Sequence, residues 1–196
     1  MSAFTWPPEN VPGAGAGAPR PPETPAAVLV PLFLDEASTT HLVLTRRRAD
    51  LRRHAGEISF PGGRRDGEDA SLMETALREA EEEIGLPRAQ VQMIGELPAT
   101  STFATNYVIH PFVASIPPGT AWTLSPREVD AVIELPLPQL REGRTTAQLT
   151  RRGITFQTDA YVVDEHFIWG ATARIIEDLL SRLRDGGGPL QPLRLE

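Results

Sequence analysis

Short apolar runs recur along this chain, and most are rich in β-branched or aromatic residues. Such runs, bounded by proline, glycine or polar residues, are typical of β-strands. They predict strands over residues 26–34, 41–45, 57–60, 91–97, 107–116 and 131–135, followed by a late hairpin over 154–156 and 160–163. Pro31 falls inside the first run, which either weakens that strand prediction or indicates an edge position or a bulge.

Two longer segments predict helices. The first covers residues 70–84 and ends at Gly85, with Pro87 beyond it, a typical stop signal. The second covers residues 168–183 and is followed by three glycines at 186–188. Strands outnumber helices and no regular repeat is visible. The pattern therefore predicts an α/β domain in which helices pack against a mixed sheet, rather than a regular βαβ series.

The composition bounds the organisation of the chain. Its 196 residues suit one domain with tails. Residues 1–25 contain a stretch dense in proline, glycine and alanine, and residues 185–196 are similar. Both are expected to be flexible tails, which leaves a domain over 26–184.

Charge and cysteine content narrow the function classes. The net charge of −7 argues against broad nucleic-acid binding, which needs a basic face. Cysteine is absent, which excludes disulfides and thiolate metal sites. No apolar run approaches the roughly 20 residues of a membrane span, and no basic start precedes an apolar run. We expect a cytoplasmic protein that binds neither membranes nor nucleic acid.

Acidic residues cluster near the end of the first predicted helix. At about 100° per residue, Glu79, Glu82 and Glu83 converge on one patch, whereas Glu81 points elsewhere. Arg78 lies one turn before Glu82 and can pair with it, which would orient the patch. An apolar stripe beside the patch is expected to dock on the sheet; it consists of Met73, Leu77, Ala80 and Ile84.

The acidic patch has two interpretations. Charge runs are usually solvated helix faces. Three convergent carboxylates are also ligands that Mg²⁺ or Mn²⁺ accepts. The sequence "FPGG" at 60–63 predicts a tight turn before the helix. This turn favours the metal-site interpretation, because glycine lets the backbone come close to a ligand. A zinc site is not indicated, because the four histidines show no paired ligand spacing.

The glutamate-rich end of the first predicted helix, together with Gly63, matches a known family signature. The stretch "REAEEEIGL" from Arg78 to Leu86, preceded by Gly63, resembles the signature of the Nudix hydrolase family at every fixed position of its second half. Ala80 is a small choice for the aliphatic position. The first half departs from the signature. Asp69 stands where the family usually has glutamate, and eight rather than seven residues separate it from Arg78.

A second motif narrows the resemblance. Residues 44–63, "LTRRRADLRRHAGEISFPGG", look like the extended segment of coenzyme A pyrophosphatases within that family, as do 125–137 and 168–173. The resemblance covers about residues 26–184. It implies the Nudix α/β/α sandwich with a mixed β-sheet. It also implies hydrolysis of coenzyme A, or its derivatives, to 3′,5′-ADP and phosphopantetheine with Mg²⁺ or Mn²⁺.

The resemblance also implies roles for single residues. Glu79 and Glu83 are the expected metal ligands, with Glu82 and the Gly63 carbonyl as further ligands. A general base is needed, and Glu128 is the candidate, with Glu82 as the alternative. Glu128 also has a plain interpretation as an acidic residue at a helix start after Pro126.

An arginine-rich segment over residues 46–53 would attract a polyphosphate to an otherwise acidic protein. Arg46 and Arg52 are expected to contact phosphate because they match the subgroup motif. His54 would fix the loop or bind phosphate. The remaining arginines of the segment are expected to face solvent: Arg47, Arg48 and Arg53. Trp169 is expected to pack in the core.

Two rival functions stay open. One is a diphosphatase for ADP-ribose or dinucleotides. The other is a non-catalytic nucleotide-binding module on the same fold, which loss of the glutamates would favour and which their presence here argues against. The expected partner is a small-molecule substrate, and the sequence is compatible with a homodimer.

Overall fold

A computed structural model describes residues 23–50, 56–102, 106–151 and 153–185. The expected tails therefore lie mostly outside the described residues. So do Arg52, Arg53 and His54, whose expected roles stay predictions.

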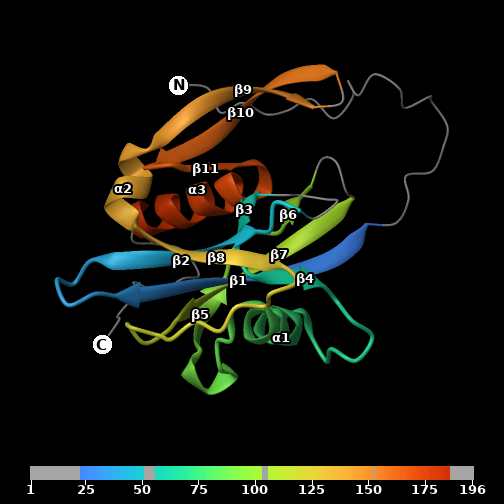
Figure 1. Cartoon of the computed structure of the whole chain (residues 1–196), viewed down its shortest axis with the longest axis vertical. Helices are drawn as coiled ribbons and strands as arrows, with labels where there is room; N and C mark the ends of the chain where they lie inside the picture. The colour runs from blue at the N-terminus through green and yellow to red at the C-terminus, as the bar shows by residue number, and fades with distance from the viewer. Residues whose placement is uncertain (1–22, 51–55, 103–105, 152, 186–196) are drawn as a thin grey trace.

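The described chain alternates strands with few helices (Figure 1). The strands are β1 (Thr24–Leu34), β2 (Thr40–Arg47), β3 (Ile58–Ser59), β4 (Gly62–Arg64), β5 (Gln92–Glu96), β6 (Thr100–Ser101), β7 (Tyr107–Ser115), β8 (Val129–Pro136), β9 (Arg144–Arg151), β10 (Ile154–Val163) and β11 (His166–Trp169). The helices are α1 (Leu72–Ile84), α2 (Leu137–Glu142) and α3 (Gly170–Asp185), with a 3₁₀ turn η1 (Arg88–Gln90).

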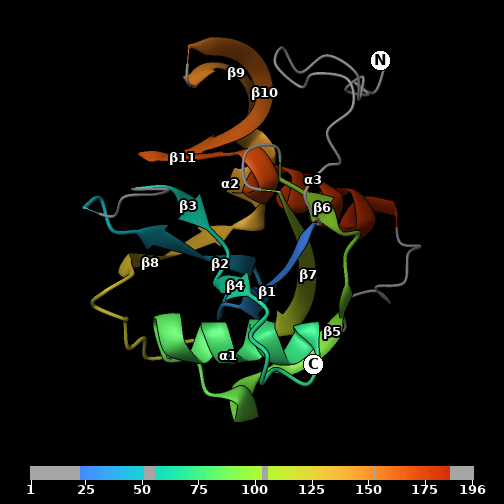
Figure 2. The ribbon, with the colours of Figure 1, turned by 90° about the vertical axis from the view of Figure 1, so that its right-hand side faces the viewer.

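The main sheet is mixed, as the sequence predicts. Its central order is β3-β2-β1-β7-β5, with β4 on β1, β6 on β7 and β8 on β2. The β1–β7 pair is parallel and the others are antiparallel. Figures 1 and 2 show α1 on one face of this sheet and α3 on the other, with the smaller β11-β10-β9 sheet on the same side as α3. The predicted α/β/α sandwich is confirmed.

Strand alternation divides the core into two halves. Val30 and Leu32 of β1 face α3, whereas Leu29 and Phe33 face α1. The same alternation along β2 sends successive side chains to opposite helices. Because both faces are covered, these strands are apolar on both sides and do not show the half-polar pattern of an exposed sheet.

The segment from β3 to β4 enters the main sheet where β1 and β2 diverge. β3 pairs with the end of β2, the Leu29 N–H donates to the Pro61 carbonyl, and β4 pairs with the start of β1. The tight turn predicted for "FPGG" is therefore wrong: a bend at Pro61 joins two short strands. Pro31 lies at neither an edge nor a bulge but where β1 changes partner from β4 to β2. No ladder hydrogen bond is lost there.

Several predicted elements shift. The proposed late hairpin is wrong, because residues 154–163 form the single strand β10, which pairs with β9 and β11. The last helix begins at Gly170, two residues after its predicted start, because residues 166–169 form β11. The strands β4, β6, β9 and β11 and the helix α2 were not predicted.

Helix α1 begins as its sequence suggests but is rotated from the predicted orientation. The Ser71 hydroxyl accepts the Glu74 N–H, a standard N-cap. The predicted docking stripe is partly wrong, since Met73 is 37% exposed while Ala76 and Glu83 are buried. The small side chains of Ala76 and Ala80 allow the helix to approach the sheet closely, and this rotation brings Glu83 inward.

Within the described ranges, no helix has the length and apolar character needed to cross a membrane.

Candidate functional site

Two glutamates of α1 lie directly against the glycines of β4. The Gly62 N–H donates to Oε2 of Glu83 at 3.3 Å. A Cβ at Gly63 would stand 2.3 Å from Oε1 of Glu79, and a Cβ at Gly62 would stand 2.3 Å from the Ala27 carbonyl oxygen of β1. A side chain at Gly62 would collide with the backbone of β1, and one at Gly63 would displace the Glu79 carboxylate. The two glycines let helix, inserted strand and carboxylates meet in a space that a larger residue would fill.

The end of α1 anchors the loop that carries Glu128. Gly85 ends the helix with φ of 68°, a left-handed conformation that favours glycine. Two N–H groups of the loop donate to the last carbonyls of α1, from Thr123 to Ile84 at 3.0 Å and from Ser125 to Glu83 at 2.8 Å. A Cβ on Gly85 would lie 2.7 Å from Cβ of Thr123. This glycine therefore allows the loop to sit close to the glutamates.

Glu128 itself lies in a turn immediately before β8. The Ser125 carbonyl accepts the N–H groups of Glu128 and Val129, and the described loop continues into a strand. The interpretation of Glu128 as a helix-start residue is therefore wrong. A bulge in the β2–β8 ladder follows, because Arg46 pairs with Ala131 while Arg47 pairs with Val129. Bulges commonly redirect side chains beside functional sites.

Arg47 joins this acidic site. Its Nη1 lies 3.7 Å from Oε1 of Glu83 and 3.7 Å from Oε2 of Glu128. The expectation that Arg47 faces solvent is wrong, since its side chain is 28% exposed and its Nε is buried. The reason is strand alternation, which places Arg47 on the α1 face together with Val43. Its guanidinium draws Glu83 and Glu128 toward one point.

Burial makes these carboxylates reluctant to ionise. Loss of hydration, followed by the neighbouring Glu79 charge, raises the pKa of Glu83 to about 8, against the lowering effects of the Gly62 N–H and Arg47. Burial is also the main reason that the pKa of Glu79 is raised, and the charges of Glu82 and Glu128 add to it. A cation bound beside these carboxylates would therefore favour their ionised forms.

Arg78 holds the outer side of the patch. Its Nε and Nη2 donate to the two carboxylate oxygens of Asp69 at 2.9 and 3.0 Å, and its Nη1 lies 3.1 Å from Glu79 and 3.2 Å from Glu82. The expected Arg78–Glu82 pair is confirmed. Hydrogen bonding by Arg78 holds the pKa of Asp69 well below its usual range, although burial opposes it.

Sequence reasoning missed the role of Asp69. This buried residue also accepts the Thr75 hydroxyl at 2.9 Å and the Asp66 N–H at 2.9 Å. Asp69 therefore connects the loop, the helix and Arg78. Its acidic character at the position of the family's glutamate was the available signal, although the altered spacing obscured it.

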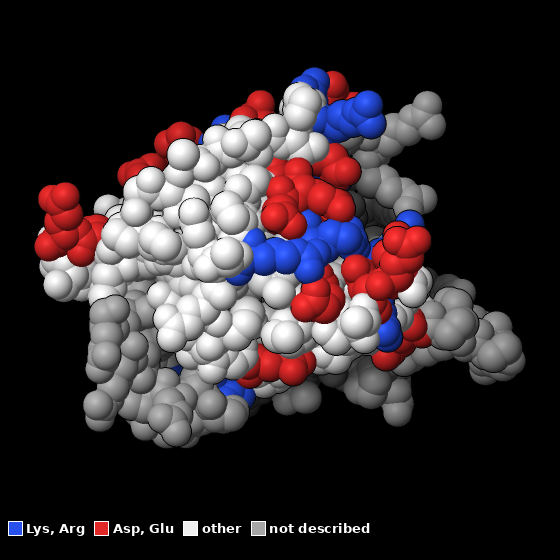
Figure 3. Space-filling model, turned by 90° about the horizontal axis from the view of Figure 1, so that it is seen from below, with Lys and Arg blue, Asp and Glu red and all other residues white. Residues whose placement is uncertain are grey.

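The three glutamates predicted to converge occupy different surroundings. Glu79 and Glu83 face β4, whereas the side chain of Glu82 is 59% exposed and paired with Arg78. Glu81 points away, as expected, and accepts Arg88 Nε at 3.2 Å. Acidic side chains surround arginines over this face of the molecule (Figure 3).

The donor set suits a hard divalent cation. In the described part of the chain, no three acidic or histidine side chains stand together as a ready metal cage. Mg²⁺ does not need such a cage, because it commonly binds one or two carboxylates and completes its shell with water and substrate phosphate. Glu79 and Glu83, close together and only partly neutralised, fit that requirement. A metal role for Glu82 and for the Gly63 carbonyl stays a prediction.

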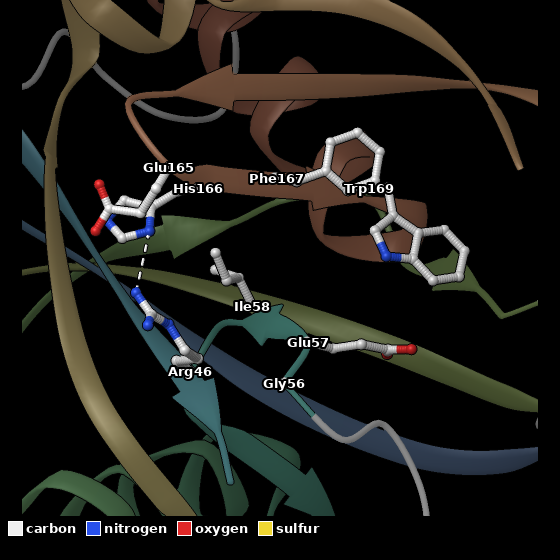
Figure 4. A pocket seen from close by; sticks show the side chains of 8 residues that line it. All are labelled: Arg46, Gly56, Glu57, Ile58, Glu165, His166, Phe167 and Trp169. Carbon is white, nitrogen blue, oxygen red and sulfur yellow. Dashed lines mark hydrogen bonds and ion pairs between the residues drawn. The ribbon is translucent and has the colours of Figure 1, made fainter. Parts of the chain in front are cut away.

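Arg46 lies on the other face of the sheet. Its Nη2 is 3.3 Å from Nδ1 of His166, at a pocket of about 420 Å³ where β11 passes β3 (Figure 4). Phe167 and Trp169 also line this pocket. Trp169 is partly exposed there, so the expected core position is wrong. The predicted phosphate contact of Arg46 thus belongs to a location separate from the carboxylates.

Comparisons with known proteins identify the family of this chain. The family model described as NUDIX domain matches residues 23–155. The "Uncharacterized Nudix hydrolase NudL" of Photorhabdus laumondii is 40% identical over 161 residues, covering 81% of this chain and 84% of that protein. The protein of the same description from Salmonella paratyphi B is 42% identical over 156 residues, covering 79% and 80%.

A solved structure shares the fold. The MutT/nudix family protein from Enterococcus faecalis superimposes with a TM-score of 0.63 at 17% identity, over 92% of this chain and 69% of that one. The chain therefore belongs to the Nudix hydrolases, a family of pyrophosphohydrolases that act on small nucleotide-like substrates and typically depend on a divalent metal.

Proposed function

We propose that this chain is a coenzyme A diphosphatase, which hydrolyses the diphosphate linkage of coenzyme A or its thioesters to 3′,5′-ADP and (acyl-)phosphopantetheine. One observation carries the proposal. The segment 44–63, which resembles coenzyme A pyrophosphatases, also builds the acidic site, because it supplies Arg47 from β2 and the glycines of β4. The glycines that end this motif, Gly62 and Gly63, thus lie beside Glu83 and Glu79.

A divalent metal bound at Glu79 and Glu83 would neutralise diphosphate oxygens and lower the pKa of bound water. The chain's own residues prepare the site for this. The Gly62 N–H and Arg47 hold the Glu83 carboxylate, and Arg78 contacts that of Glu79. Arg47 also adds a positive charge beside the acidic residues, which helps an anionic substrate to approach.

Glu128 is the better candidate for the general base. Hydrolysis requires that a water oxygen attack phosphorus while one phosphorus–oxygen bond breaks, and the attacking water must give up a proton. Arg47 holds Glu128 toward Glu83. The side chain of Glu128 is 50% exposed, so water and substrate can reach it. Glu82 is engaged by Arg78 on the outer side of the helix, which makes it less suited to accept that proton.

The test is direct. Purified protein is incubated with coenzyme A or ADP-ribose in the presence of Mg²⁺ or Mn²⁺, and products are identified by chromatography and mass. We expect 3′,5′-ADP and phosphopantetheine from coenzyme A, at a higher kcat/KM than for ADP-ribose. Faster cleavage of ADP-ribose or a dinucleotide would overturn the substrate assignment. No cleavage of any of them would favour a non-catalytic nucleotide-binding module.

A further inference from the structure

The pocket beside Arg46 combines cationic and aromatic groups. Figure 4 shows Arg46 and His166 pointing toward each other at one end, with Ile58 between them and the aromatic residues Phe167 and Trp169. Its volume of about 420 Å³ lies within the range of small-molecule sites. The side chain of Phe167 is one of the few large apolar groups in the described part of the chain that stay exposed.

The backbone explains why these groups meet. Residues 167 and 169 lie two apart on β11 and share one side of the strand, while the Ile168 side chain is buried on the other. The strand passes β3, whose residue Ile58 pairs with Arg46 on β2. The pocket is therefore formed by the edges of the two sheets.

Two neighbouring arginines connect this pocket to the acidic site. Arg46 and Arg47 are consecutive on β2 and face opposite sides of the sheet. One guanidinium stands among the catalytic carboxylates and the other stands at the pocket. The Gly56 N–H donates to the Arg47 carbonyl, and the Arg47 N–H donates to the Glu57 carbonyl. The two locations thus lie on opposite faces of the end of β2, beside the residues that lead into β3.

Coenzyme A carries phosphate in two separate places, as a substrate that reached both locations would require. Its diphosphate linkage is the scissile group, and a separate phosphomonoester sits on the ribose 3′ oxygen beside the adenine. ADP-ribose has the linkage alone. A guanidinium next to an imidazole suits a phosphomonoester, and aromatic faces suit a nucleobase.

Resting on the proposed function, we propose that this pocket binds the 3′-phosphoadenosine end of the substrate. Arg46 and His166 take the 3′-phosphate, and Trp169 takes the adenine. Two acidic side chains, Glu57 and Glu165, also line the pocket. Glu165 is 75% exposed and its carboxylate lies 4.0 Å from His166 Nε2. Glu57 lies toward Trp169 and away from Arg46 in Figure 4, on the side assigned to the base.

Binding without catalysis tests the pocket. The full chain is titrated calorimetrically in EDTA with 3′,5′-ADP, 5′-AMP and phosphopantetheine. We expect Arg46→Gln to weaken 3′,5′-ADP about tenfold to a hundredfold, the usual effect of losing a charged hydrogen bond, and to leave 5′-AMP unchanged. Trp169→Leu should weaken both nucleotides about tenfold. Arg88→Gln, which changes an exposed arginine paired with Glu74 and Glu81, is the control.

Specific outcomes overturn the assignment. If the parent protein binds 3′,5′-ADP and 5′-AMP with equal affinity, or if Arg46→Gln weakens both by the same factor, Arg46 does not bind the 3′-phosphate. Binding of phosphopantetheine that Trp169→Leu abolishes would assign the pocket to the other end of the substrate. Failure of the proposed function looks different, since coenzyme A would stay intact while 3′,5′-ADP still bound through Arg46. Conversely, hydrolysis of coenzyme A and dephospho-coenzyme A with equal kcat/KM would sink only the pocket assignment.

Discussion

Replacing Glu83 should stabilise the metal-free protein, although Glu83 is one of the two metal ligands that we propose. The pKa of Glu83 is raised from 4.5 to about 8, chiefly by burial. The folded state therefore holds this proton more tightly than the unfolded chain does. Stability is greatest below pH 4.5 and declines as the pH rises toward 8, because the unfolded chain ionises first.

The magnitude follows from that shift. At pH 7 folded Glu83 keeps a proton that the unfolded chain has released, which lowers the unfolding free energy by roughly 3 kcal/mol, and by somewhat more above pH 8. Glu83→Gln removes the charge while its amide oxygen still accepts the Gly62 N–H. We expect the melting temperature in EDTA to rise by roughly 6–12 °C at pH 7–8 for a chain of this size. The gain should vanish near pH 4.5.

Thermal unfolding of both proteins in EDTA across pH 4.5–8.5 measures this directly. Glu81→Gln is the matched control, since Glu81 lies two residues away on the same helix but pairs with Arg88 at the surface. It should change the melting temperature little at any pH. A Glu83→Gln protein that is less stable than the parent at pH 8, or equally shifted at every pH, would refute the argument that burial opposes ionisation there.

Three further variants test other parts of the site. Gly63→Ala places a Cβ where Oε1 of Glu79 now lies; kcat should fall about a hundredfold, as for a reacting group moved by 1 Å, and unchanged kcat would contradict the close packing. Asp69→Asn weakens the bidentate bond from Arg78 and should lower the urea unfolding free energy by about 2 kcal/mol. That loss should appear above the ordinary aspartate pKa of about 4 and diminish in acid, since the pKa of Asp69 is lowered in the fold. Glu128→Gln should reduce kcat by roughly 10² to 10⁴, the usual contribution of a general base; a loss under tenfold, measured with saturating metal, would transfer that role to another residue.

Periodicity and stop signals account for much of the fold. The apolar runs along β1, β2 and β7 and the helix ending at Gly85 are local features, and each was predicted near its observed bounds. Strand β4 was not, because "FPGG" contains no strand-forming residues beyond Phe60. Gly62 and Gly63 adopt a strand conformation only because β1 and β2 diverge there. The start of β1 is then free to pair with the two glycines. That cause lies in the tertiary structure.

The site shows the same division between local and distant information. The helical wheel separated Glu81 from Glu79 and Glu83, since that depends only on α1. It could not show that Arg47 rather than Arg46 reaches the carboxylates. Both faces of β2 are covered by apolar layers, so alternation predicts opposite directions for the two side chains but does not tell which one faces α1.

The central claim is that Glu79 and Glu83 bind a divalent cation on which cleavage of coenzyme A depends. The most direct measurement combines Mn²⁺ binding, followed by electron paramagnetic resonance, with coenzyme A turnover in the parent, Glu83→Gln and Glu81→Gln proteins. We predict that the parent and Glu81→Gln bind Mn²⁺ and cleave coenzyme A, and that Glu83→Gln remains folded but loses both properties. Cleavage at the parent rate by Glu83→Gln, or by the parent in excess EDTA, would contradict the account.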